Sequence, residues 1–288
     1  MSAQEILDLL EQSGLEQYKT SFAQWIFPTA QLILEPKSDE LLQIGESKVG
    51  GDPDLLEEVE WPKWKGYDMT FIAQINLAEC PTNLSLPSAG LLSFFYGVEG
   101  MYEDPDFYGD PHTSRVIYTS PDQLEYIVRR SSPGTLNAAG AMMKPNSISF
   151  IPNLSVPAAE SAYLESVGLG WNGEREDFDK YWEIFLPKTE KLWQREGYIN
   201  RFMGHPDPVQ GDMQRSCEIA YGSYTDDELD KTEFINSAIK WRLLLQIDSE
   251  EEKTGIMWGD VGRIYYWIHE DDLAQLRFDR VFCEMQCC

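Results

Sequence analysis

The sequence predicts an α+β fold that is mainly antiparallel β, a β-rich roll of two pseudo-symmetric halves with peripheral helices. Three observations lead to this prediction. A group of motifs occurs twice along the chain, short apolar segments follow one another through short connections, and helical periodicity is confined to the N-terminus and the middle. Short connections favour antiparallel pairing of consecutive strands. We expect a single domain over all 288 residues.

The repeated motifs define the two halves. Residues 48–54 read Lys-Val-Gly-Gly-Asp-Pro-Asp, and residues 201–207 read Arg-Phe-Met-Gly-His-Pro-Asp. Residues 71–76 and 243–248 form a second matching pair that shares a Gln-Ile dipeptide, and in both copies a glycine further on leads an aromatic strand. Two copies are too few for a solenoid, so we expect two similar β-rich halves that share one core.

The first 47 residues are expected to form helices and then a strand. Ser2 and Glu5 have the spacing of a capping box ahead of an apolar stripe, and Gly14 ends this helix. A second amphipathic stripe is expected to stop at Pro28, because proline interrupts helices. Residues 31–35 follow as the first strand.

The rest of the chain divides into the first β-rich half (48–156), a helical connection (157–200) and the second β-rich half (201–288). Apolar and alternating patterns predict strands at residues 71–77, 91–96, 115–119 and 147–151. In the connection an aromatic stripe has helical spacing, and we expect it to pack in the core and to end or kink at Pro187. The members of this stripe are Phe178, Tyr181, Trp182 and Phe185.

Composition excludes several classes of protein. The chain has 49 acidic residues against 23 Lys and Arg, a formal charge of −26. Nucleic acids and anionic membranes recruit clustered basic residues, so we expect neither as a partner. We likewise expect no membrane span and no secretory signal. The charge would attract a basic protein or a cation, or it serves solubility alone.

The cysteines predict neither disulfides nor a zinc site. There are five, an odd number, and no two of them form a C-x-x-C pair. We therefore expect a reducing, cytoplasmic location, with no cofactor and no bound metal.

The same motifs resemble the YwqG-like family of bacterial proteins. The similar segments are residues 50–54, 61–62 and 71–77 in the first half and residues 204–212, 241–248 and 257–262 in the second. Leu56 departs from the family pattern, which often has proline there. The resemblance implies a β-rich roll, a cytoplasmic location and an unknown activity. It also implies a possible role beside bacterial toxins, as an immunity protein.

One turn of the second half carries candidate chemistry. His205, Asp207 and Asp212 would bind a divalent metal or perform acid–base chemistry if their side chains converge, and Gln210 of the same turn is a candidate for ligand binding. Alternatively, the aspartates cap turns and the start of a helix at residues 209–220. The first copy keeps Pro-Asp but has Asp52 in place of the histidine, which favours a shared structural turn.

Two further groups of residues are candidates for ligand binding. Gln74 and Asn76, like Gln246 and Asp248, lie on the polar faces of equivalent strands, where they would either line a groove or bond to backbone. Trp258 and Asp260 flank a glycine ahead of the last aromatic strand, which suits either a ligand platform or a tight turn around a buried Trp.

These observations favour a non-enzymatic binding or interaction protein with an acidic surface. Its expected partner is a basic protein or a small ligand held between the two halves. The alternatives are a metal-dependent hydrolase built on His205, Asp207 and Asp212, and an immunity protein against a basic toxin.

Overall fold

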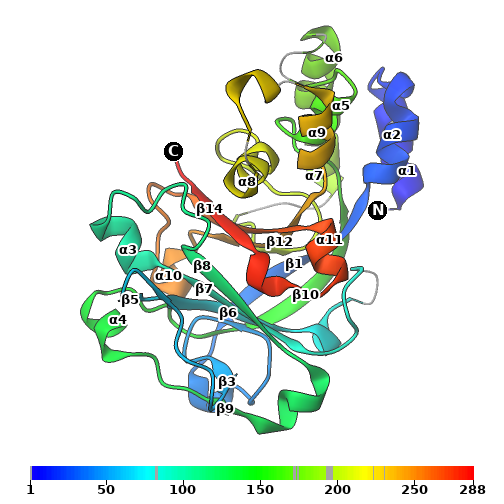
Figure 1. Cartoon of the computed structure of the whole chain (residues 1–288). Coiled ribbons are helices and arrows are strands. Elements are labelled where there is room, and N and C mark those ends of the chain that lie inside the picture. Colours follow the sequence, from blue (N-terminus) through cyan, green and yellow to red (C-terminus); the bar gives the residue numbers. More distant parts are fainter. Residues whose placement is uncertain are drawn as a thin grey trace.

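The computed structural model describes residues 2–81, 84–170, 173, 175–192, 197–222, 224–229 and 231–288. A ten-stranded antiparallel sheet dominates this part of the chain, in the order β14-β13-β12-β11-β1-β10-β2-β6-β7-β8. The sheet curves until it is nearly closed into a barrel (Figure 1). This arrangement confirms the predicted α+β, mainly antiparallel β fold.

The strands of this sheet are β1 (Phe27–Pro36), β2 (Lys48–Val49), β6 (Thr70–Asn76), β7 (Leu91–Tyr96), β8 (Ser114–Thr119), β10 (Asn146–Ser155), β11 (Arg201–Phe202), β12 (Trp241–Asp248), β13 (Arg263–His269) and β14 (Phe282–Gln286). Two small pairs lie outside it, β3 (Asp54–Leu56) with β9 (Ile127–Arg129) and β4 (Lys63–Trp64) with β5 (Tyr67–Asp68).

The helices are α1 (Ala3–Gln12), α2 (Lys19–Trp25), α3 (Val98–Glu103), α4 (Gly134–Ala138), α5 (Ala162–Ser166), α6 (Arg175–Asp179), α7 (Leu186–Leu192), α8 (Met213–Tyr221), α9 (Thr232–Ala238), α10 (Glu251–Thr254) and α11 (Glu270–Ala274). The π-helical segment η5 (Lys180–Phe185) joins α6 to α7. Within the described residues, every helix is too short or too polar to span a lipid bilayer.

The strand order is symmetric about the β1–β10 pair. On one side of this pair the order is β10-β2-β6-β7-β8, and on the other it is β1-β11-β12-β13-β14. Lys48 on β2 pairs with Gln74 on β6, and Arg201 on β11 pairs with Gln246 on β12. The two copies of the sequence motif thus occupy corresponding places in the sheet.

The first strand is longer than predicted and lies in an unexpected place. It begins at Phe27 and includes Pro28, which pairs with Leu154 of β10. Helix α2 has already ended at Trp25, so Pro28 does not stop it directly. Although β1 belongs to the N-terminal segment, its other neighbour is β11 of the second half, where Ala30 pairs with Phe202.

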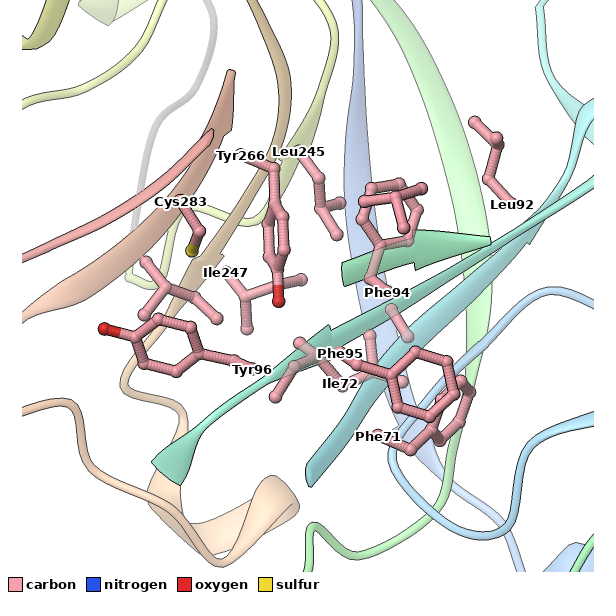
Figure 2. Packing of buried hydrophobic residues seen from close by; sticks show 14 of the residues in the cluster. Phe71, Ile72, Leu92, Phe94, Phe95, Tyr96, Leu245, Ile247, Tyr266 and Cys283 are labelled. Atoms are coloured by element: carbon pink, nitrogen blue, oxygen red, sulfur yellow. The ribbon is translucent and has the colours of Figure 1, made fainter. Parts of the chain in front are cut away.

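The core lies inside the curved sheet and joins the two halves. Phe94 of β7 and Tyr266 of β13 meet edge to face, with ring centroids 5.1 Å apart. Figure 2 shows these rings among Leu245, Ile247 and other aliphatic side chains from both halves. Such burial of aromatic rings is a large stabilising contribution.

The outer face of β12–β14 is covered by helix α8. Met213 and Cys217 of that helix pack on Trp241, Tyr265 and Trp267 of the strands. Both faces of β12 and β13 are therefore buried over most of their length. Helices α1, α2 and α5–α9 gather on this same side of the sheet (Figure 1).

The N-terminal helix forms as predicted. Ser2 and Glu5 make both hydrogen bonds of the capping box at the start of α1, which satisfies backbone donors that have no partner within the helix. Ile6 and Leu10 of this helix pack with Phe22, Tyr181 and other side chains in a separate apolar cluster. This cluster fixes the N-terminal helices against the helical connection.

The aromatic stripe of the connection only partly fits the core prediction. Phe178, Tyr181 and Phe185 are buried, but Trp182 is 54% exposed. The helical backbone also does not end at Pro187. This proline is the second residue of α7, and the wide π-helical turn of η5 directly precedes α7. A proline removes one α-helical hydrogen bond from the turn that precedes it, and the π-helical turn occurs at that point.

Candidate functional site

The ring of His205 is buried against backbone and aromatic groups. It is 2% exposed, and its Nε2 lies 2.7 Å from the carbonyl oxygen of Trp25. The ring stacks on Phe27, with centroids 4.7 Å apart. Burial lowers the pKa of His205 to about 3, so the ring is neutral and Nε2–H donates to the carbonyl. His205 thereby connects the turn of the second half to the junction of α2 and β1.

The two aspartates of the same turn have different partners. The Asp207 carboxylate forms an ion pair with Arg263, and the Asp207 backbone N–H donates to Gln246 Oε1 at 2.9 Å. Asp212 is the N-cap of α8, where its Oδ1 accepts from the Gln214 N–H at 2.8 Å. The sequence predicted a helix from residue 209, whereas α8 begins at Met213, directly after its N-cap Asp212.

Asp212 also carries a desolvated oxygen. Its Oδ2 is buried without a hydrogen-bond partner in the described residues, and burial raises the pKa of this carboxyl to about 7. Across the described ranges, no group of three or more His, Cys, Asp or Glu side chains is placed to hold a metal ion. The contacts of His205, Asp207 and Asp212 hold the turn in place, as the capping alternative predicts.

The polar strand residues of both halves are engaged with neighbouring segments. Gln74 and Gln246 are fully buried. The Asn76 side chain donates to the Gly45 carbonyl at 2.8 Å, and Asp248 accepts from the Ile199 N–H at 2.8 Å. These contacts support the alternative in which the side chains bond to backbone rather than line a groove.

The remaining sequence candidates differ in their burial. Trp258 is fully buried and its ring centroid lies 6.2 Å from that of Tyr96, whereas Asp260 is exposed. Gln210 is exposed too, and its backbone N–H donates to Gln286 Oε1 at 2.8 Å. A buried Trp in a tight turn is the alternative that these contacts support for residues 258–260.

One cavity lies between the helical connection and the turn of the second half, and we call it the turn cavity. Its volume is about 360 Å³. Its polar and aromatic lining comes from Glu160, Trp182, Thr189, Arg201 and Asp207, and four prolines and several apolar residues complete the described lining. Asp207 is the one sequence candidate among these lining residues.

A second cavity, the edge cavity, lies where the two halves approach each other. Its volume is about 380 Å³. Tyr96, Tyr108 and Asp110 line it from the first half, and Ile219 and Glu284 line it from the second. None of its described lining residues is Lys, Arg or His, so its charged side chains are both carboxylic acids.

The two acids of the edge cavity differ in their surroundings. The Asp110 carboxylate accepts hydrogen bonds from Trp64 Nε1 at 2.9 Å and from the His112 N–H at 2.8 Å. Burial raises the pKa of Glu284, and hydrogen bonding from the side chains of Gln286 and Ser216 offsets part of this effect. Glu284 Oε2 is enclosed and has no hydrogen-bond partner among the described residues.

Sequence reasoning missed both Glu284 and the exposure of Trp182. Glu284 is the single charged residue of β14, whose sequence is Phe-Cys-Glu-Met-Gln. A lone acid in an apolar strand was the available signal, because charged groups are seldom buried without a partner. No comparable signal marked Trp182, since its spacing matches that of its buried neighbours.

The chain was compared with known protein families and with curated proteins. No curated protein matches it. Residues 47–287 match the family described as "Domain of unknown function (DUF1963)". The matched region contains both copies of the repeated motif and most of the sheet. Because this match extends over much more than half of the sequence, the chain belongs to the DUF1963 family.

Proposed function

We propose that the protein is a binding protein without catalytic activity and that its edge cavity receives a cationic group. The observation that carries this proposal is that Glu284 lines the cavity and that one of its carboxyl oxygens is buried without a hydrogen-bond partner in the described residues. A buried carboxylate is costly unless a hydrogen-bond donor or a positive charge compensates it. A guanidinium or ammonium group of a ligand would supply both.

Aromatic rings around the cavity favour the same kind of ligand. Tyr96, Phe107 and Tyr108 contribute to its lining, and Tyr108 is 63% exposed. Aromatic faces attract cations through their quadrupole, and this attraction is stronger for partly desolvated groups. The formal charge of −26 would raise the rate at which a cationic ligand arrives.

The volume of the edge cavity is compatible with a small molecule or with one side chain of a larger partner. Pockets of about 300–1,000 Å³ are usual for small ligands, and this cavity has about 380 Å³. A basic side chain of a protein partner has the same cationic chemistry and is the other candidate occupant of the edge cavity. An immunity role against a basic toxin would be one instance of this second case.

The proposed cellular context follows from the sequence. Resemblance to YwqG-like proteins supports a bacterial origin, and five free cysteines agree with a reducing cytoplasm. The metal-dependent hydrolase has no comparable support, because His205, Asp207 and Asp212 make separate structural contacts. Stoichiometric metal in the purified protein that is lost in His205→Ala would favour the hydrolase instead.

A matched pair of ligands tests the binding proposal. Titration calorimetry would compare argininamide with citrullinamide, which has a similar shape but a neutral urea in place of the guanidinium. We expect argininamide to bind the wild type at least roughly tenfold more tightly. Glu284→Gln should remove this preference, whereas Glu58→Gln, which removes an exposed surface charge, should keep it.

Two results would contradict the proposal. One is equal binding of the two ligands by the wild type. The other is an unchanged preference in Glu284→Gln, which would place the cation elsewhere on the acidic surface. A pull-down with basic proteins at low and high salt then separates a protein partner from a small ligand, because exposed charge pairs weaken with ionic strength.

A further inference from the structure

An exposed tryptophan on a π-helical segment lines the turn cavity. Trp182 lies in η5, a π-helix that spans Lys180–Phe185. π-Helical turns are rare and occur frequently at functional sites. Trp182 has the sequence spacing of the buried Tyr181 and Phe185, yet 54% of its surface is exposed and it lines the cavity.

A carboxylate in the same cavity has no partner among the residues that the structure describes. No hydrogen bond or ion pair of Glu160 occurs within the described part of the chain. The other charged groups of the lining are already engaged, since Arg201 donates to the His205 carbonyl and Asp207 pairs with Arg263. Glu160 is therefore the charged group of this cavity that is available to a ligand.

The rest of the lining is mainly apolar and rigid. It includes Pro157, Pro187, Pro206 and Pro208, whose rings restrict the backbone around the cavity. A largely apolar cavity of about 360 Å³ with few polar groups has the character of a small-molecule site. At the corresponding turn of the first half, Asp39 accepts from the Asp52 N–H at 3.0 Å and occupies the space beside Gly51.

We propose that the turn cavity is a second binding site, for a small molecule that joins an aromatic ring to an amine. The ring packs on Trp182 and the apolar walls, and the amine donates to Glu160. Ring stacking adds specificity beyond the area that is buried. A charge-assisted hydrogen bond to the carboxylate sets the orientation of the ligand.

Three probe molecules test how much the ring and the amine each contribute to binding. Tryptamine has both the ring and the amine, indole has the ring alone, and ethylamine has the amine alone. We expect calorimetry to show that tryptamine binds the wild type at least roughly tenfold more tightly than either fragment. Trp182→Ala should weaken the binding of tryptamine at least roughly tenfold. Glu160→Gln should bind tryptamine no more tightly than indole.

Matched variants keep this test specific. Ile184 is on the same π-helical segment and 41% exposed, but it is not among the lining residues, so Ile184→Ala should bind tryptamine as the wild type does. Glu284→Gln, in the edge cavity, should also leave tryptamine unaffected. The proposal is overturned if the wild type does not prefer tryptamine, if Trp182→Ala keeps full affinity, or if Glu284→Gln removes binding.

Discussion

Gln74 and Gln246 make the same two hydrogen bonds in corresponding strands. Gln74 Oε1 accepts from the Asp54 N–H at 2.9 Å, and its Nε2 donates to the Glu46 carbonyl at 2.8 Å. Gln246 Oε1 accepts from the Asp207 N–H at 2.9 Å, and its Nε2 donates to the Ile199 carbonyl at 2.7 Å. Each amide therefore fastens the two ends of one copy of the glycine-containing turn.

Removing either amide should destabilise the protein. Gln74→Ala and Gln246→Ala each leave a backbone N–H and a carbonyl without a side-chain partner in a buried place, so we expect a loss of about 2–4 kcal/mol in the free energy of unfolding. Urea unfolding measures this loss. The exposed Gln43 is the control, since Gln43→Ala should change stability by less than about 0.5 kcal/mol. Unchanged stability in both buried variants would show that these bonds are dispensable.

Replacing Asp212 by asparagine should stabilise the protein at alkaline pH. The pKa of Asp212 is raised in the folded state from 3.8 to about 7, so the stability this carboxyl provides is full below pH 3.8 and is lost as pH rises through 7. Asparagine keeps the N-cap without ionising. We expect Asp212→Asn to gain about 1–3 kcal/mol at pH 8 and nothing near pH 3.5. A loss of stability at pH 8 would contradict this account.

Lowering the pH should reduce the stability of the fold, because His205 is protonated more readily in the unfolded chain. The pKa of His205 is about 3 in the folded state, against an ordinary value of 6.5 for the unfolded chain. As pH falls, the unfolded chain therefore takes up the proton first. The contribution of this residue is constant above pH 6.5 and declines between pH 6.5 and 3. His205→Gln keeps a donor for the Trp25 carbonyl but does not titrate, and its stability should vary less with pH in this window. Identical pH profiles, measured by thermal unfolding, would exclude this role.

Cation binding at the edge cavity should depend on pH. Because burial raises the pKa of Glu284, part of the population is protonated above the ordinary range of a glutamate, and a cationic ligand displaces that proton. We expect the affinity for argininamide to increase as pH rises through the raised pKa, with proton release in calorimetry. Glu284→Gln should show neither effect. A flat profile in the wild type would mean that Glu284 does not face the ligand.

Local patterns predicted much of the fold. The capping box at Ser2, the aromatic strand at residues 91–96 and the paired motifs around Gln74 and Gln246 depend on neighbours in sequence. Such signals arise from backbone hydrogen bonding and from side-chain alternation, and the sequence contains both.

Long-range features were not predictable in the same way. The position of β1 beside β11 is set by tertiary pairing, and neither strand alone indicates the other. Trp182 is exposed on the π-helical segment η5, and Glu284 lies where β14 approaches Tyr96 of β7 and helix α8. These candidate sites therefore became visible only in three dimensions.

The central β1–β10 pair has a consequence for how the chain acquires its shape. Strand β1 meets its partner over ten residue pairs, from Phe27 with Ser155 to Pro36 with Asn146, and its other neighbour comes later still, at Arg201 and Phe202. During synthesis, β1 would thus be made long before the residues that pair with both of its edges. Contacts between such distant segments slow folding, so we expect the pairing of both edges of β1 to be a late event in folding.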